Sequence, residues 1–323
     1  MPIVSDPASI PVQGNIPRPP HQFDTFDNII YALRSTWINI KPPQADGSHY
    51  GDGYAMHSLL WSRHKGYADG VFLWDEFKPT SDDDWSFKQV VPGPVGLIYA
   101  VDSNDNLWWY DHLGRADGSK LWAKRQTVGV GWHILTTNPR PKNMLGIFCD
   151  TQNGSQIDRP NSIIYAVSVR DDRTLGLDWY RHDGVRNGAF TWAYTDPKFI
   201  SGIKLAGQQR IFSGSNGIIY LIGDDGQLRW YKHKGYQDGS SACEGPNVIS
   251  DVSSDWSHFS NVFSIGRGII YAITRNGDLW WFKHKGYLNG DRGLESSKAP
   301  VGVGWNNVSV VCNSVYLHPN YIN

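Results

Sequence analysis

The sequence has little of several features that commonly decide what a protein does. It has only three cysteines, Cys149, Cys243 and Cys312, and their wide separation excludes a short-spaced metal or redox motif. No apolar run approaches the roughly 18 residues of a membrane helix, so we expect no membrane insertion. The 30 Lys and Arg residues balance 31 Asp and Glu residues, with a net charge of -1. Bulk electrostatics therefore give no reason to expect a nucleic-acid partner.

The N-terminal segment 1–22 lacks the features of a signal peptide. It has neither a basic start nor a long apolar stretch, and its prolines predict an extended tail. We therefore expect a cytoplasmic protein, or one exported without a classical signal. Secretion stays open, because Asn153 and Asn307 each begin an N-x-[Ser/Thr] sequon that would matter in a secreted protein.

Catalytic motifs are missing as well. There is no nucleophile elbow of the G-x-S-x-G type, no H-E-x-x-H zinc motif and no phosphate-binding loop, so no cofactor is expected. The abundant residues are 15 Trp, 16 Tyr and 34 Gly. Because aromatic residues favour strands and glycine favours turns, this composition predicts a turn-rich all-β protein.

One pattern, Leu-x-Trp-x-x-His-x-Gly-x-x-[Asp/Asn]-Gly, occurs five times. An Ile-Tyr pair precedes every copy, and the Tyr residues are Tyr31, Tyr99, Tyr165, Tyr220 and Tyr271. The Trp and His residues of the five copies are Trp61 and His64, Trp109 and His112, Trp179 and His182, Trp230 and His233, and Trp281 and His284. Turn dipeptides such as Asp225-Gly226 and Asn276-Gly277 stand between Tyr and Trp, which predicts a hairpin in each unit. An outer strand is expected around Trp74, Trp122 and Trp192.

The spacing of the repeats favours a β-propeller. The five histidines are separated by 48, 70, 51 and 51 residues, close to the length of a four-stranded blade. We therefore predict an all-β fold, a five-bladed β-propeller of four-stranded antiparallel blades spanning residues 23–323. Two insertions, about 34–58 and 136–160, should form loops. The C-terminal segment 301–323 resembles a piece of the repeat, so its strand should pair with the first blade and close the ring.

A further element, Gly-Trp, precedes several of the units. It is intact at Gly131-Trp132 and at Gly304-Trp305-Asn306, and altered to Asp84-Trp85 and Asp255-Trp256. It is missing before the fourth unit, where Phe199-Ile200-Ser201-Gly202 stands. Together with the Gly-x-Ile-Tyr-Ala-Val strands, this element resembles the tachylectin family over about residues 23–313. The resemblance implies a five-bladed lectin with one shallow site per blade for N-acetylated amino sugars.

The Gly-Trp residues carry two interpretations. In the first, Trp85, Trp132, Trp256 and Trp305 offer a ring face to a sugar, while Asp84, Asp255 and Asn306 bind its hydroxyl and acetamide groups. In the second, the tryptophans seal the seam between blades. The repeat tryptophans should be core residues, since both faces of a blade are covered. The five histidines should cap the glycine turns, because symmetry spreads them around the ring, and we expect no metal site.

Two further functions remain as alternatives to a multivalent lectin for N-acetylated glycans. One is an enzyme with a single aromatic pocket on the axis, roofed by the two insertions, that positions an apolar small molecule. The other is a protein-interaction scaffold. Without a catalytic motif we favour a binding protein over an enzyme. Whether it forms a homo-oligomer stays open.

Overall fold

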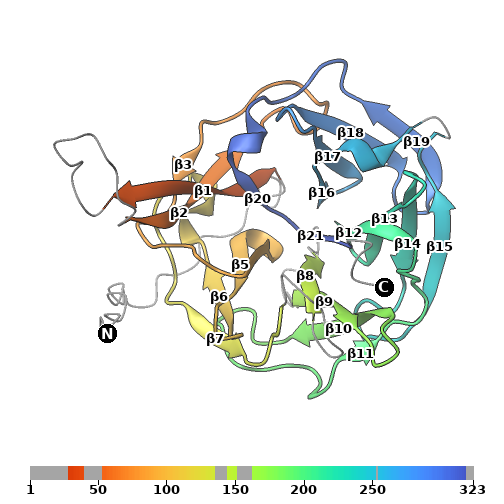
Figure 1. Cartoon of the computed structure of the whole chain (residues 1–323), viewed down its shortest axis with the longest axis horizontal. Helices are drawn as coiled ribbons and strands as arrows, with labels where there is room; N and C mark the ends of the chain where they lie inside the picture. The colour runs from red at the N-terminus through yellow and green to blue at the C-terminus, as the bar shows by residue number, and fades with distance from the viewer. Residues whose placement is uncertain (1–27, 40–52, 135–143, 151–161, 252–253, 318–323) are drawn as a thin grey trace.

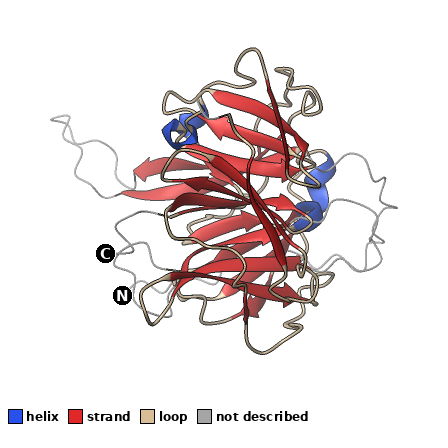
Figure 2. Ribbon diagram, turned by 90° about the vertical axis from the view of Figure 1, so that its right-hand side faces the viewer, coloured by secondary structure: helices blue, strands red, loops and turns tan. Residues whose placement is uncertain are grey.

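The computed structural model describes residues 28–39, 53–134, 144–150, 162–251 and 254–317. Within these ranges the chain forms five antiparallel sheets arranged as a ring, which confirms the predicted five-bladed propeller (Figure 1). Helix is confined to short 3-10 turns, and strands and loops make up nearly all of the body (Figure 2). The predicted tail 1–22 and Asn153 lie outside the described residues.

Each blade is built on four strands; from the axis outward they follow one another along the chain in blades 2 to 5, whereas the innermost strand of blade 1 is the C-terminal β20. Blade 1 has β20 (Ser309–Val311), β1 (Ile29–Asn39), β2 (Gly53–Arg63) and β3 (Lys78–Pro79). Blade 2 has β4 (Gln89–Pro92), β5 (Leu97–Val101), β6 (Leu107–Asp111) and β7 (Gln126–Gly129). Blade 3 has β8 (Met144–Asp150), β9 (Ser162–Val169), β10 (Leu175–His182) and β11 (Lys198–Phe199). Blade 4 has β12 (Gln208–Ser215), β13 (Ile218–Gly223), β14 (Leu228–His233) and β15 (Cys243–Val248). Blade 5 has β16 (Asn261–Gly266), β17 (Ile269–Ile273), β18 (Leu279–Gly286) and β19 (Asp291–Ser296).

The C-terminal segment closes the ring, as predicted. Strand β20 pairs with β1, with Val311 opposite Tyr31. The chain then crosses the centre of the ring (Figure 1) and adds β21 (Ser314–Tyr316) to the inner edge of blade 4, with Val315 opposite Ile211. Val315 and Leu317 are buried there in a core cluster shared by blades 3 and 4. The chain therefore crosses the centre of the ring just before β21.

The repeated residues hold neighbouring blades together. In every blade the Tyr of the Ile-Tyr pair lies opposite the repeat Trp across the central hairpin. Each repeat Trp is at most 2% exposed, as predicted for a core residue, and its Nε1 donates to a carbonyl of the next blade. The last glycine of the next repeat packs on the ring of that Trp. At Gly118, for example, an added Cβ would lie 2.7 Å from Trp61, and the φ angle of +74° also favours glycine.

The five histidines make the second contact of every junction. Each Nδ1 lies 2.5–3.0 Å from the hydroxyl of the Tyr of the preceding blade, as in Tyr31–His112 and, across the ring closure, Tyr271–His64. Each Nε2 faces a backbone carbonyl seven residues on. A carbonyl can only accept, so Nε2 carries the proton and Nδ1 accepts from the tyrosine hydroxyl. The histidines thus cap their turns, as expected, and desolvation lowers the pKa of each one.

Two details of the strands differ from the prediction. Trp74, Trp122 and Trp192 each make a single bridge to the repeat His, and the outer strands begin later. The chain first folds back so that each of these indoles lies over the His ring, at centroid separations of 4.1–4.9 Å. In the predicted insertions, residues 40–52, 136–143 and 151–160 are outside the described part. The rest is not loop: β1 and β2 form one long hairpin, and Met144–Asp150 is the inner strand β8.

Candidate functional site

The four tryptophans of the Gly-Trp elements lie at four of the five junctions between blades. Trp85, Trp132, Trp256 and Trp305 are 2–5% exposed, so each one packs into its junction, as the seam interpretation expects. Their rings also contact aromatic residues of the blade that follows. Trp132, for example, lies with its ring centroid 4.8 Å from Tyr180 of β10 and 5.7 Å from Trp192.

Glycines on both sides of Val130 allow Trp132 to adopt this position. A Cβ on Gly129 would lie 2.3 Å from Nε1 of the indole, so only glycine fits under the ring. Gly131 has a φ of +77°, a left-handed conformation that turns the chain into Trp132. The backbone N–H of Trp132 then donates to Asp105 O in the hairpin turn of blade 2. Because Asp105 lies between β5 and β6, blade 2 fixes the tryptophan that fills the seam with blade 3.

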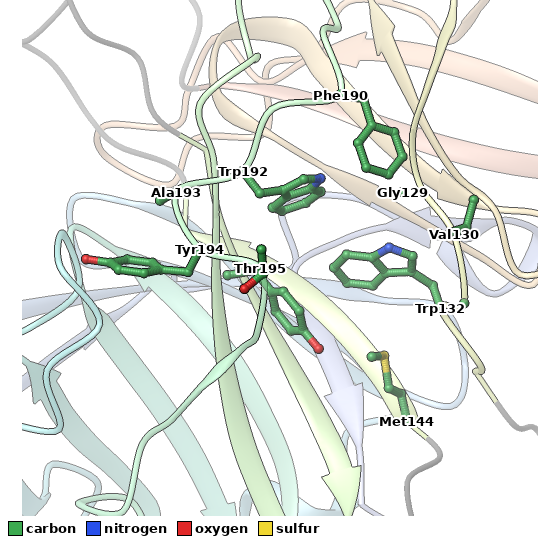
Figure 3. A pocket seen from close by; sticks show the side chains of 11 residues that line it. Gly129, Val130, Trp132, Met144, Phe190, Trp192, Ala193, Tyr194 and Thr195 are labelled. Atoms are coloured by element: carbon green, nitrogen blue, oxygen red, sulfur yellow. The ribbon is translucent and has the colours of Figure 1, made fainter.

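Beside Trp132 the surface is hollowed into a pocket of about 500 Å³. Trp132, Phe190 and Trp192 lie together there, with Val130 and Met144 on the Trp132 side (Figure 3). The aromatic residues of the lining are Trp132, Tyr180, Phe190, Trp192 and Tyr194. A volume of this order accommodates a small ligand.

The pocket presents aromatic faces and neutral polar groups. None of its lining residues carries a charged side chain; Tyr180, Thr195 and the glycine backbone supply the polar atoms. Burial raises the pKa of Tyr180, and the nearby Asp178 carboxylate raises it further, so its hydroxyl stays protonated. The indole N–H of Trp192 is already used, since it donates to Val128 O at 2.7 Å. Such a surface suits the apolar C–H face of an uncharged ring with hydroxyl substituents.

The junction of Trp305 repeats this construction at the ring closure. Gly302 lies under the indole as Gly129 does, with the same 2.3 Å from an added Cβ to Nε1, and Gly304 has a φ of +75°. Trp74 occupies the place of Trp192, 5.1 Å from Trp305, and its Nε1 donates to Val301 O. Asn306 follows in the short 3-10 turn Trp305–Asn307, and its side chain is exposed.

The junction of Trp85 is built differently. The long hairpin of blade 1 replaces the tight turn, so Trp85 N donates to His57 O of β2. Trp85 Nε1 donates to Ser81 Oγ at 2.6 Å. Asp84 is exposed, and its carboxylate accepts from His57 N and from Ser86 Oγ. Asp84 therefore organises the loop around the tryptophan.

The last two junctions diverge further. Trp256 packs on Phe282 and Phe259, and exposed Asp255 caps the short turn by accepting from Ser257 N. Hydrogen bonds from the hydroxyl and the backbone N–H of Ser257 lower the pKa of Asp255. At the junction of blades 3 and 4, which has no Gly-Trp element, Ile200, Ile203 and Leu205 fill the space in the described structure.

The sequence indicated the tryptophans of the Gly-Trp elements as candidate site residues, but it did not indicate the residues that join Trp132 in the pocket. Tyr180, Phe190, Trp192 and Thr195 join Trp132 in the pocket although they follow it by 48 residues or more. The repeated tryptophan ten residues after each of the first three histidines was the available signal. The sequence predicts an outer strand at each of these tryptophans, whereas in the structure each tryptophan returns to the junction.

The described part of the chain also bears on the other interpretations. Among these residues no group of three or more His, Cys, Asp and Glu side chains could hold a metal ion. None of the helices described has the length and apolar composition needed to cross a membrane. An axial pocket would share its space with β21, whose Val315 packs against Gly146 of β8.

Comparison with known proteins gives one informative result. The family model named Tachylectin matches residues 150–315. No curated protein matches the chain. Among solved structures, the chain is similar to a fungal alcohol oxidase of the AA5 family in complex with copper, at 12% identity and a TM-score of 0.34. That match covers 85% of this chain and 54%, about half, of the oxidase. It is also similar to Sqt1 of Saccharomyces cerevisiae, at 9% identity and a TM-score of 0.28, over 78% of this chain and 66% of Sqt1.

Proposed function

Because the chain belongs to the tachylectin family, we propose that it binds carbohydrate at the aromatic pockets between its blades. The observation that carries this proposal is the pocket of about 500 Å³ at Trp132, whose lining includes the aromatic side chains of Trp132, Tyr180, Phe190 and Trp192 and no charged one. A pyranose ring could cover these faces with its C–H groups, while its hydroxyls bind Thr195, the Tyr180 hydroxyl and the Gly129–Gly131 backbone.

N-acetylated amino sugars are the ligands we propose. An acetamide group has an apolar methyl for the aromatic wall and an N–H and a carbonyl for backbone groups. It also carries no charge, as the uncharged lining requires. The same arrangement of glycines and tryptophans recurs at Trp305, and we propose a second binding site at that junction. Sites that are individually weak would bind a glycan-coated surface firmly, since one rigid ring carries several of them.

Isothermal titration calorimetry of the full chain with N-acetylglucosamine, glucosamine and glucose tests the proposal. We expect N-acetylglucosamine to bind at more than one site, and the two sugars without an acetyl group to bind at least tenfold more weakly. No heat with any glycan, or binding that ignores the acetyl group, would contradict it.

A matched pair of variants locates the site. Thr195 and Thr191 are both exposed and lie on the same segment, but only Thr195 lines the pocket. Thr195→Arg should therefore fill the pocket and reduce the stoichiometry by one site, whereas Thr191→Arg should bind as the unaltered protein does. Truncating Trp132 itself is less informative, because loss of a buried tryptophan costs about 3–5 kcal/mol of stability.

A further inference from the structure

Two exposed apolar side chains form a rim at the mouth of the Trp132 pocket. The packing of Trp132 does not depend on them. Val130 is 67% exposed and Phe190 is 58% exposed, although both line the pocket. Neither side chain is needed to hold Trp132, which the glycines and the Asp105 carbonyl fix. Two largely exposed apolar side chains at the mouth of one pocket gain stability only when something apolar covers them.

The Trp305 junction carries the same rim. Val303 has the place of Val130 in an identical Val-Gly-Val-Gly-Trp segment and is also 67% exposed. Phe72 stands two residues before Trp74, as Phe190 stands two residues before Trp192, and is 59% exposed. The hydrogen bonds of Trp74 to Val301 O and of Trp192 to Val128 O fix this correspondence. The two apolar rims are therefore a matched pair.

At the Trp85 junction the same two positions are charged. Trp122 Nε1 donates to Thr80 O, which makes Thr80 the counterpart of Val128 and Asp82 the counterpart of Val130. Lys120 stands two residues before Trp122, in the place of Phe190. Asp82 and Lys120 form an ion pair. Because these side chains touch, the two rim positions of this junction lie next to each other.

We infer that the Trp132 pocket and the matching Trp305 junction select uncharged glycosides that carry an apolar aglycone, whereas the Trp85 junction does not. This inference rests on the proposed function, since the sugar must first occupy the pocket. The aglycone then covers Val130 and Phe190, or Val303 and Phe72, and removes their apolar surface from water. At the Trp85 junction an alkyl chain would instead have to displace the ion pair of Asp82 and Lys120.

Calorimetry with methyl and octyl β-glycosides of N-acetylglucosamine, the latter below its micelle concentration, tests the inference on the full chain. We expect the octyl glycoside to bind about tenfold more tightly than the methyl glycoside. Two sites per chain should show this difference in affinity. Equal affinities would overturn the inference and leave the proposed function standing. Binding of neither glycoside would overturn both.

Exchanging the rims sharpens the test. A variant with Val130→Asp, Phe190→Lys, Val303→Asp and Phe72→Lys copies the charged rim onto both apolar junctions, and the affinity ratio of octyl to methyl glycoside should fall from about ten to about one. The converse variant, Asp82→Val with Lys120→Phe, should raise the stoichiometry of the octyl preference from two to three. All six side chains are on the surface, so melting temperatures check that each variant is folded.

A control variant addresses non-specific binding of the octyl chain. Leu288 is 66% exposed in the glycine turn of blade 5 and belongs to none of the rims. Leu288→Lys should keep the tenfold ratio. A ratio that falls in this variant as much as in the rim variant, or that survives the rim exchange, would overturn the inference.

Discussion

The junctions of Trp132 and Trp85 each bury an indole between two blades, but they accommodate it in different ways. At Trp132, glycine at position 129 lets the indole lie against the backbone, and the tight turn of blade 2 anchors the loop. At Trp85, the counterpart of Gly129 is Ser81, whose hydroxyl accepts from the indole N–H, and the long hairpin of blade 1 supplies the anchor. In both, the buried tryptophan contacts a second one, Trp192 or Trp122.

The comparison separates the scaffold from the recognition surface. The buried tryptophans and the repeat histidine beneath them are the same at both junctions. The exposed rim changes from Val130 and Phe190 to Asp82 and Lys120. Packing restricts buried positions to a few side chains, whereas a rim position is free to vary. Differences in ligand preference should therefore lie at the rim.

The largest effect should follow from removing the segment that closes the ring. Deletion of residues 301–323 takes away Trp305, β20 and β21, and exposes the edges of blades 1 and 4. We expect the ring to lose its cooperative fold, because the inner strands that close it and the packing of Trp305 against blade 1 disappear with the segment. Circular dichroism and a thermal scan of the truncated chain measure this. A truncated chain that melts at the temperature of the full chain would contradict ring closure as described.

Acid should cause the next largest loss of stability. The pH at which the histidine becomes protonated should differ between the two junctions. Desolvation lowers the pKa of all five histidines, so below about pH 6.5 the unfolded chain binds more protons than the folded one. Stability should be complete above that pH and fall as the pH decreases toward the folded pKa values. Asp150, whose pKa burial raises to about 6, opposes this trend as a single group.

His112 of the Trp85 junction should lose its neutral form last. Desolvation and the Arg115 guanidinium together lower the pKa of His112 to about 4, whereas at His182, whose pKa desolvation also lowers, the Asp183 carboxylate opposes the shift. This shift of His112 alone corresponds to roughly 3 kcal/mol of lost stability at low pH. Urea unfolding between pH 7.5 and 4.5, with NMR titration of the imidazole protons, measures both quantities. Stability that is constant over this range would refute the role assigned to the histidines.

Gly129→Ser tests whether the two solutions are interchangeable. The new Cβ would overlap Nε1 of Trp132, so the indole or the backbone has to move. We expect a loss of about 1–3 kcal/mol in the free energy of unfolding, as for an overpacked core. Denaturant titration provides the value, and Gly302→Ser should reproduce it. A neutral Gly129→Ser would show that the tight fit under the indole is not required.

Ser81→Ala should have the smallest effect. It removes the acceptor of the Trp85 indole N–H without adding volume, so we expect a loss of about 1 kcal/mol. The same denaturant titration measures it. If Ser81→Ala lowered the free energy of unfolding by more than Gly129→Ser does, the hydrogen bond to the Trp85 indole would stabilise its junction more than the tight fit under Trp132 does.

Local pattern was enough to predict much of the fold. The hairpins followed from Ile-Tyr strands and turn dipeptides such as Asp225-Gly226, and the burial of Trp61 and Trp109 followed from their repetition. The paths of Trp74, Trp122 and Trp192 were not predicted. A tryptophan near a glycine turn suits a strand and a return to the junction equally well, and the choice depends on hydrogen bonds to Val301, Thr80 and Val128 in other blades.

The candidate site was predicted only in part, for the same reason. The sequence indicated Trp132 and Trp305, because their Gly-Trp elements are intact, but it could not choose between a sugar face and a seam. The structure shows that the tryptophans fill the seam and also form one wall of a pocket. The exposed Asp84 and Asp255 cap their own loops, a role that depends on partners such as His57 and Ser257.

By itself, the sequence determined the repeat, the number of blades and the closure of the ring. These depend on contacts that every unit repeats, so the pattern is visible in one dimension. The tertiary structure alone decided which side chains meet at each mouth. Val130 and Phe190 are 60 residues apart, and Phe72 and Val303 belong to opposite ends of the chain. Their meeting depends on how neighbouring blades stack, and no local preference of either segment encodes it.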